Sequence, residues 1–207
     1  MKLYLQTITF LLIATMSQAQ TQTLFGGNKT YGGFGGPIME FSNINGTLVT
    51  DVGGGGALIV NDFFFGGYGL GNDNSNIELD NGLNALDFGH GGFWLGYTHN
   101  QHKLVHLYSS FRIGWGDVDL KRGDDLTASD NLMAICPELG LEFNVTRWFK
   151  LGVSGGYRIV TGLDNLPGGL DNDDFTGGFG MLTFRFGGFG DYNDWDDDDD
   201  DDYGFNF

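Results

Sequence analysis

The amino-acid sequence predicts an all-β fold, an eight-stranded antiparallel up-and-down barrel followed by a disordered acidic tail. Three observations predict it: the composition, segments in which apolar and polar residues alternate, and connections that alternate in length. Glycine accounts for 37 of 207 residues and aromatic residues for 15%, whereas an average protein has roughly 7% glycine. Glycine costs about 1 kcal/mol against alanine inside a helix, while aromatic side chains suit pleated strands. The composition therefore disfavours helices.

Three segments show the clearest strand pattern, at residues 103–116, 132–145 and 148–161. In each of them apolar residues recur at every second position, which is typical of a half-buried strand. The apolar faces contain Val105, Leu107, Phe111, Ile113 and Trp115 (with Ser109), then Met133, Ile135, Leu139, Leu141, Phe143 and Val145, and then Phe149, Leu151, Val153, Tyr157 and Ile159.

Five weaker segments complete a set of eight strands. They are residues 31–42, 47–60, 63–72, 86–100 and 175–187. The barrel domain is thus expected at residues 31–187.

The connections between these segments alternate in length. Asn61-Asp62, Gln101-His102 and Thr146-Arg147 form tight turns, whereas residues 73–85, 117–131 and 162–174 form long polar loops. Only the first connection of the long series, residues 43–46, is short. Short turns at one end and long loops at the other are typical of transmembrane barrels of bacterial outer membranes.

The N-terminus has the pattern of an export signal. Lys2 precedes an apolar run that ends before Ser17-Gln18-Ala19, a small-x-small cleavage site. We expect residues 1–19 to be a signal peptide and residues 20–30 to be a short segment before the barrel. No later segment has 18 consecutive apolar residues, so only a closed barrel could carry the chain through a membrane.

The faces opposite the apolar ones carry charges that would converge on the barrel interior. The inward set is Glu40, His90, Trp94, His106, Tyr108, Arg112, Glu138, Glu142, Lys150, Ser154, Arg158, Thr183 and Arg185. Charges removed from water persist when they are paired and hydrogen-bonded. We therefore expect lumen ion pairs that join Glu40, Glu138 and Glu142 to Arg112, Lys150, Arg158 and Arg185, and that plug the barrel.

Two other readings of the same alternation stay open. A secreted soluble barrel of the lipocalin type would turn the apolar faces inward and bind an apolar small molecule, and a membrane barrel could hold a narrow channel. Aromatic residues near strand ends favour the membrane barrel, because interfacial girdles lie there. They are Tyr97, Trp115, Trp148, Phe149 and Phe186.

Two prolines fall inside expected strands. Pro37 and Pro137 each lack a backbone N–H donor. A closed barrel has no free edge strand at which this missing donor would leave no partner unpaired. A β-bulge at Cys136-Pro137 is the expected repair.

The segment 31–187 resembles the small eight-stranded outer-membrane barrel class, of which OmpX and the OmpA membrane domain are members. Phe184-x-Phe186, which ends the last strand, is similar to the aromatic ending by which barrel-assembly machinery recognises its clients. In that class the aromatic residue usually ends the chain, whereas twenty residues follow here, with Phe205 and Phe207 at the end. The resemblance implies residence in the outer membrane, contact with its lipid, and a structural or surface-interaction role.

No catalytic, cofactor-binding or metal site emerges from the sequence, and we do not expect an enzyme. His106 and Ser110 share a strand face but lie four residues apart, about 13 Å. The acidic loops lack the twelve-residue spacing of a dedicated calcium site. Divalent cations are possible partners of these loops and of the tail.

The C-terminal segment, residues 188–207, is strongly acidic. It has nine aspartates, seven of them consecutive at residues 196–202, and without them the formal net charge of −17 would be −8. A block of like charges repels itself and is expected to be disordered. Nucleic acid is not an expected partner, since phosphate binding requires clustered Lys and Arg.

Overall fold

The structure is a computed structural model that describes residues 31–72, 75–79, 82–122, 125–164 and 166–190. The expected signal peptide, the segment 20–30 and nearly all of the acidic tail lie outside the described residues. The strands are β1 (Tyr31–Ile44), β2 (Thr47–Val60), β3 (Phe63–Gly71), β4 (Ser75–Leu79), β5 (Gly82–His99), β6 (Val105–Arg122), β7 (Asp125–Thr146), β8 (Phe149–Thr161) and β9 (Gly177–Gly188). A 3₁₀ turn, η1 (Pro167–Gly169), and a single helical turn, α2 (Asn172–Phe175), precede β9.

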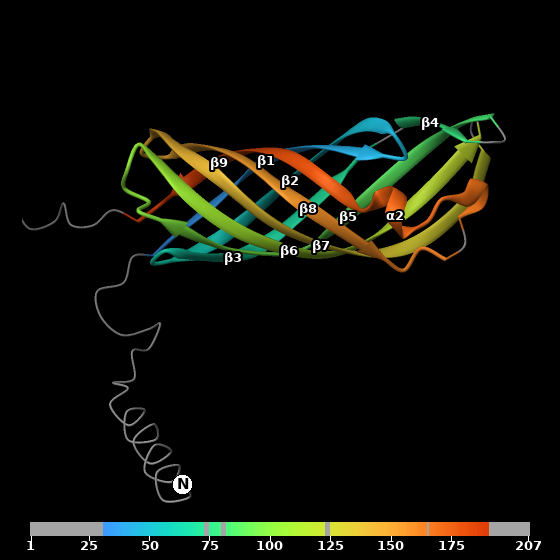
Figure 1. Cartoon of the computed structure of the whole chain (residues 1–207). Helices are drawn as coiled ribbons and strands as arrows, with labels where there is room; N and C mark the ends of the chain where they lie inside the picture. The colour runs from blue at the N-terminus through green and yellow to red at the C-terminus, as the bar shows by residue number, and fades with distance from the viewer. Residues whose placement is uncertain (1–30, 73–74, 80–81, 123–124, 165, 191–207) are drawn as a thin grey trace, which may run out of the picture.

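Eight of these strands form one closed antiparallel ring (Figure 1). Neighbours in the sequence pair with each other, and the pairings of β1 with β9 and of β3 with β5 close the ring. β4 pairs with β5 beyond the ring, as an extension of the connection between β3 and β5. The prediction of an eight-stranded up-and-down barrel is confirmed.

The prediction of long loops is wrong in part for two of the three segments, because the strands continue into them. β6 runs to Arg122 and β7 begins at Asp125, so most of the segment 117–131 is a β-hairpin. The segment 73–85 likewise contains β4 and the start of β5. The polar residues of the hairpin alternate with Val118 and Leu120, whose side chains are buried inside the ring. Only the segment 162–174 lacks strands among the described residues of these three connections.

The short turns have the backbone geometry that tight hairpins need. Asn45 and Gly46 join β1 to β2 with φ angles of 46° and 79°, which two-residue hairpin turns require and which Asn-Gly provides at little cost. Asn61 also has a positive φ, in the turn between β2 and β3.

The bulge expected at Cys136-Pro137 is absent. Pro137 pairs in register with Phe111 on β6, and the β7–β8 ladder keeps one register on both sides of the proline. The register shifts lie elsewhere, between Leu120 and Lys121 and between Asn144 and Thr146. Because the proline interrupts the pairing with β8 without an inserted residue, the inward and outward positions of β7 are not exchanged.

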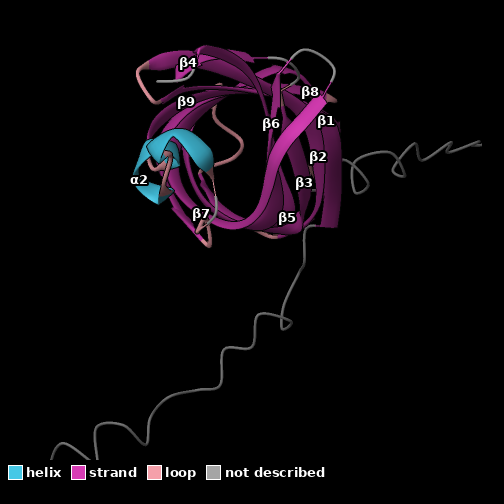
Figure 2. Ribbon diagram, turned by 90° about the vertical axis from the view of Figure 1, so that its right-hand side faces the viewer, coloured by secondary structure: helices cyan, strands magenta, loops and turns pink. Residues whose placement is uncertain are grey.

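The barrel has two distinct ends. We call the end with the Asn61-Asp62 turn, where β1 begins and β9 ends, the turn end, and the opposite end, which carries β4 and α2, the loop end (Figure 1). A view onto the loop end shows α2 against the wall of the ring (Figure 2), where it contacts β1 and β8.

Buried apolar side chains fill the interior near the loop end. We call this set the apical layer: Ile44, Val49, Leu86, Phe88, Val118, Leu120, Leu132, Val160, Leu163, Leu170 and Phe175. The ring of Phe175, from α2, is fully buried and lies 5.7 Å from that of Phe88. The apical layer therefore closes one end of the barrel over the charged residues below it.

Candidate functional site

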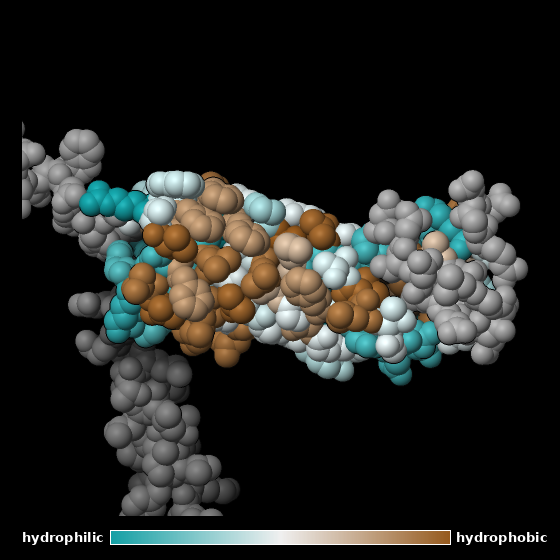
Figure 3. Space-filling view, turned by 90° about the horizontal axis from the view of Figure 1, so that it is seen from above, coloured by the Kyte–Doolittle hydropathy of each residue, from teal (hydrophilic) through white to brown (hydrophobic). Residues whose placement is uncertain are grey.

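The wall of the barrel separates apolar side chains outside from charged side chains inside. Leu107 and Val153 are 45% and 43% exposed, whereas Arg112 and Arg158 are 0% and 1% exposed. Figure 3 shows the apolar side chains gathered over the barrel wall, with hydrophilic side chains toward both ends. Hydrocarbon, and not an apolar ligand in the lumen, is the environment that this arrangement suits.

The structure places all seven residues expected to form lumen ion pairs inside the ring. Glu40, Arg112, Glu138, Glu142, Lys150, Arg158 and Arg185 are all buried. The other members of the expected inward set are buried as well: His90, Trp94, His106, Tyr108, Ser154 and Thr183. The seven charged residues form two groups, which we call the central cluster and the turn-end cluster.

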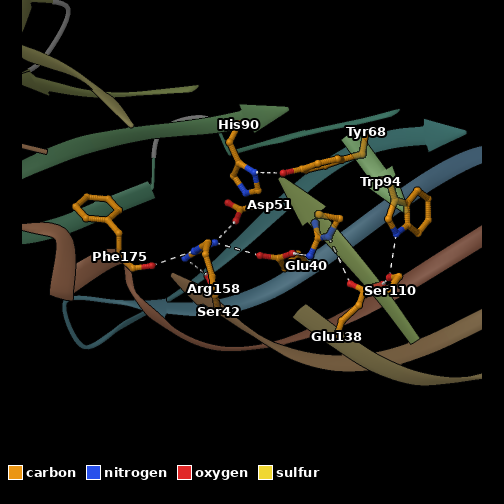
Figure 4. Close-up of polar contacts among 11 residues, drawn as sticks. Glu40, Ser42, Asp51, Tyr68, His90, Trp94, Ser110, Glu138, Arg158 and Phe175 are labelled. Carbon is orange, nitrogen blue, oxygen red and sulfur yellow. Dashed lines mark hydrogen bonds and ion pairs between the residues drawn. The ribbon is translucent and has the colours of Figure 1, made fainter. Parts of the chain in front are cut away.

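The central cluster joins two arginines to three carboxylates, and its five residues come from five strands (Figure 4). Arg112 Nη2 lies 2.5 Å from Glu40 Oε2, and Arg112 Nε lies 3.4 Å from Glu138 Oε2. Arg158 Nη1 lies 3.1 Å from Glu40 Oε1 and 3.4 Å from Asp51 Oδ2. Glu40 thus bridges the two arginines.

Neutral partners complete the central cluster. Arg158 donates from Nη2 to Ser42 Oγ at 3.1 Å and from Nε to the carbonyl of Phe175 at 3.0 Å. Ser110 donates to Glu138 and accepts from Trp94 Nε1 at 3.0 Å. The bond to Phe175 ties the cluster to α2, so the charged interior holds the connection between β8 and β9 in place.

Asp51 is a member of this cluster that the sequence pattern did not reveal. It is fully buried, it is directly opposite Glu40 in the β1–β2 register, and it accepts from Asn72 Nδ2 at 2.8 Å. The alternation along β2 could have revealed it, because Val49 and Asp51 are two positions apart and both side chains point inward. The four consecutive glycines that follow, residues 53–56, interrupt the alternation that would have fixed this phase.

The turn-end cluster surrounds one carboxylate with basic groups. Glu142 lies 2.6 Å from Arg185 Nη1, 3.1 Å from Lys150 Nζ and 2.9 Å from His106 Nε2. Since Glu142 is its only carboxylate, the turn-end cluster has more positive than negative charge. The central cluster has the opposite excess, because it has three carboxylates and two arginines.

Aromatic rings hold the Arg185 guanidinium. Its Cζ lies 4.5 Å from the centroid of Tyr108 and 4.8 to 5.0 Å from those of Phe34, Phe64 and Trp94. Desolvated cation–π contacts of this kind are each worth about 2 kcal/mol. The rings and Glu142 therefore fix Arg185 across the lumen.

The buried His90, His106 and Ser110 are not arranged as a nucleophile and its base. His106 uses Nε2 for Glu142 and Nδ1 for the carbonyl of Lys103, and His90 Nδ1 is bonded to Tyr68 Oη. Ser110 instead contacts Glu138 and Trp94. A nucleophile must be bonded to a base to be activated, and neither histidine is bonded to this serine.

No group of three or more His, Cys, Asp or Glu side chains in the described part of the chain is arranged to hold a metal ion. Among the described residues, no helix is long and apolar enough to cross a membrane.

Aromatic side chains form a patch on the outer wall at the turn end. Phe186 lies 4.8 Å from Phe149 and 6.0 Å from Trp148, ring centroid to ring centroid. Trp148 is 60% exposed. The other expected girdle residues, Tyr97 and Trp115, also point outward. Such a patch matches the position of an interfacial girdle.

No protein-family model and no curated protein matches the sequence. Solved structures do match. Neisserial surface protein A aligns with a TM-score of 0.53 and 11% identity over 79% of this chain and 99% of that one. Ail, the attachment invasion locus protein of Yersinia pestis, aligns with a TM-score of 0.48 and 16% identity over 76% and 97%.

A second structure of Ail, in complex with the heparin analogue sucrose octasulfate, aligns with a TM-score of 0.45, 16% identity and coverages of 78% and 98%. The alignment with Neisserial surface protein A shows that the chain has the fold of the small eight-stranded outer-membrane barrels, as its sequence predicted.

Proposed function

We propose that the chain is a non-catalytic outer-membrane barrel with a structural or surface-interaction role and a closed lumen. One observation carries the proposal: exposed apolar side chains cover the outer wall, while the buried charges are paired inside it. In water the outer wall would be a large unfavourable apolar surface, whereas in a bilayer it faces hydrocarbon.

The turn end faces the periplasm in this proposal. Both ends of the barrel chain, at β1 and β9, lie there together with the short turns (Figure 1), which is the arrangement of bacterial outer-membrane barrels. The loop end would face the cell exterior. It carries exposed carboxylates at Asp117, Asp164, Asp171 and Asp173.

Cell fractionation tests this location. We expect the protein in the outer-membrane fraction, with a folded form that migrates differently on a detergent gel before and after heating. Recovery as a soluble periplasmic protein would refute the membrane proposal and revive the secreted soluble barrel.

The filled interior supports a closed lumen. Arg185 and Glu142 lie across the turn-end half, the apical layer fills the loop-end half, and the cavity beside Arg185 has a volume of only about 10 Å³. A water molecule needs about that volume. We expect no discrete conductance in planar bilayers with folded protein inserted, and steady single-channel currents would establish the narrow channel instead.

The carboxylates of the loop end favour small cations over polyanions as ligands, since like charges repel. We expect weak accumulation of divalent cations at this end. Isothermal calorimetry with calcium, against sodium at matched ionic strength, measures it, and a stoichiometric high-affinity site would contradict it.

Export and assembly complete the proposal. We propose that residues 1–19 are removed after Ala19, which N-terminal sequencing of the mature protein tests. We also propose that barrel-assembly machinery recognises the end of β9, where Phe186 is 41% exposed on the outer wall. Phe186→Ala would then slow assembly in cells, and Phe65→Ala, on β3, would not.

A further inference from the structure

The turn end of the barrel, which faces the periplasm in the function proposed above, contains a pocket lined by basic side chains. It has a volume of about 300 Å³ at the turn end, and His102, Arg147 and Lys150 line it with Gln101, Phe189 and Gly190. We call it the turn-end mouth. Lys103 lies beside it, because its carbonyl accepts from Asn144 Nδ2, another lining residue, at 2.7 Å.

Positive charge is in excess at the turn-end mouth. Arg147 and Lys103 are exposed, and neither makes an ion pair with any described residue. Lys150 and Arg185 share the single carboxylate of Glu142. The only other carboxylate that the structure describes at this end is Asp62. Four permanent cations therefore face two carboxylates.

The chain leads from this mouth directly into its most acidic segment. Gly190 lines the mouth, and the seven consecutive aspartates begin only six residues later, at residue 196. Six residues span at most about 20 Å, so the acidic run is within reach of Arg147 and Lys103. A tethered segment acts at an effective concentration on the order of millimolar, at which weak contacts suffice.

We propose that the acidic run at residues 196–202 docks on the turn-end mouth of its own barrel through Lys103 and Arg147. The contact joins the cationic excess of the mouth to the anionic excess of the tail. Phe189 strengthens the site, because its ring covers Lys150 Nζ at 4.3 Å and keeps the chain close to the mouth. The exposed position of the two cations makes the docking reversible and sensitive to salt.

Paramagnetic broadening in detergent micelles tests this proposal on the full chain. A spin label is placed on Tyr203→Cys, next to the acidic run. The native Cys136 is fully buried in the lumen, so labelling of the folded protein is selective. Amide signals of Lys103 and Arg147 report the turn end, and those of Asn45 and Gly46 report the loop end.

We expect strong broadening at Lys103 and Arg147 and none at the loop end. A chain with residues 196–202 all changed to Asn keeps the tether and removes the charge. We expect it to reduce the broadening by about threefold, the size of effect that exposed ion pairs produce. Lys103→Gln with Arg147→Gln is expected to do the same, and Lys121→Gln, at the loop end, is the matched control.

Equal broadening with the charged and the neutral tail would overturn the proposal, because the tether alone would then explain it. Sodium chloride at 0.5 M should lower the broadening in the unaltered barrel, where screening is nearly complete, and insensitivity to salt would also count against docking. Broadening of labelled barrels by the spin-labelled tails of other copies would assign the contact to an intermolecular one. The amide spectrum itself reports a folded barrel, so failure here is separate from failure of membrane insertion.

Discussion

Glu40 and Asp51 are directly opposite each other on β1 and β2, and both carboxylates are fully buried. Arg158, on β8, contacts both of them: its Nη1 lies 3.1 Å from Glu40 Oε1 and 3.4 Å from Asp51 Oδ2. Like charges repel in a buried site, and Arg158 lies between these two carboxylates, while Glu40 also contacts Arg112 at 2.5 Å.

Replacing Arg158 should therefore destabilise the barrel strongly. Arg158→Met removes the cation and leaves two buried carboxylates without it, and we expect a loss of about 3–5 kcal/mol in the free energy of unfolding. Urea unfolding of the barrel in lipid vesicles measures the loss. Asp117→Asn, at an exposed position of the loop end, is the control and should change stability by less than about 0.5 kcal/mol. Equal effects of the two substitutions would show that the lumen pairs do not stabilise the fold.

The two lumen clusters should respond independently to mutation. Glu138 and Glu142 are four residues apart on β7, about 13 Å along the strand, and each belongs to a different cluster. The losses from Arg112→Met and Glu142→Gln should add within about 0.5 kcal/mol, whereas Arg112→Met and Glu40→Gln should couple by about 0.5–3 kcal/mol. Double-mutant cycles in urea check this. Strong coupling between the clusters would mean one continuous network.

The facing of the strands could be predicted because the outer wall of a membrane barrel must be apolar. Leu107 and Arg112 lie on opposite faces of β6, and their separation by an odd number of positions was visible in the sequence. Asp51 could not be placed, since the glycines at residues 53–56, which follow Val52, carry no facing information.

The extension of β6 and β7 was hidden for a different reason. The exposed apolar side chains of the outer wall, among them Leu107, Phe111 and Leu139, form what we call the apolar belt. Beyond this belt the outer face of a strand meets water, so Asp117 and Asp119 replace apolar residues there. Val118 and Leu120 still point inward, which reverses the usual pattern of the strand. The alternation continues but with apolar residues on the opposite face, and the segment therefore resembled a polar loop.

Filling the space beside Gly96 should loosen the aromatic packing around Arg185. A Cβ on Gly96 would overlap the ring of Phe64, and that ring contacts Trp94 at 5.3 Å and Arg185 at 5.0 Å between centres. Gly96→Val should cost about 1–3 kcal/mol, the usual effect of overpacking. Gly180→Ala, where a Cβ meets nothing within 4 Å, is the control. Near-ultraviolet circular dichroism and urea unfolding follow the change, and an unaltered spectrum with unaltered stability would contradict the packing.

An arginine placed on the outer wall should distinguish a membrane barrel from a soluble one. Leu139 and Leu126 lie on the same strand, β7, and are 55% and 58% exposed. Leu139 belongs to the apolar belt, next to Ser109 and Gly155 in the register, whereas Leu126 lies near the tip of the β6–β7 hairpin. Leu139→Arg should cost about 2–4 kcal/mol in lipid vesicles and Leu126→Arg only about 0–1 kcal/mol, because the penalty depends on depth in the bilayer. In a soluble barrel both positions face water, so equal small costs at the two sites would refute membrane insertion.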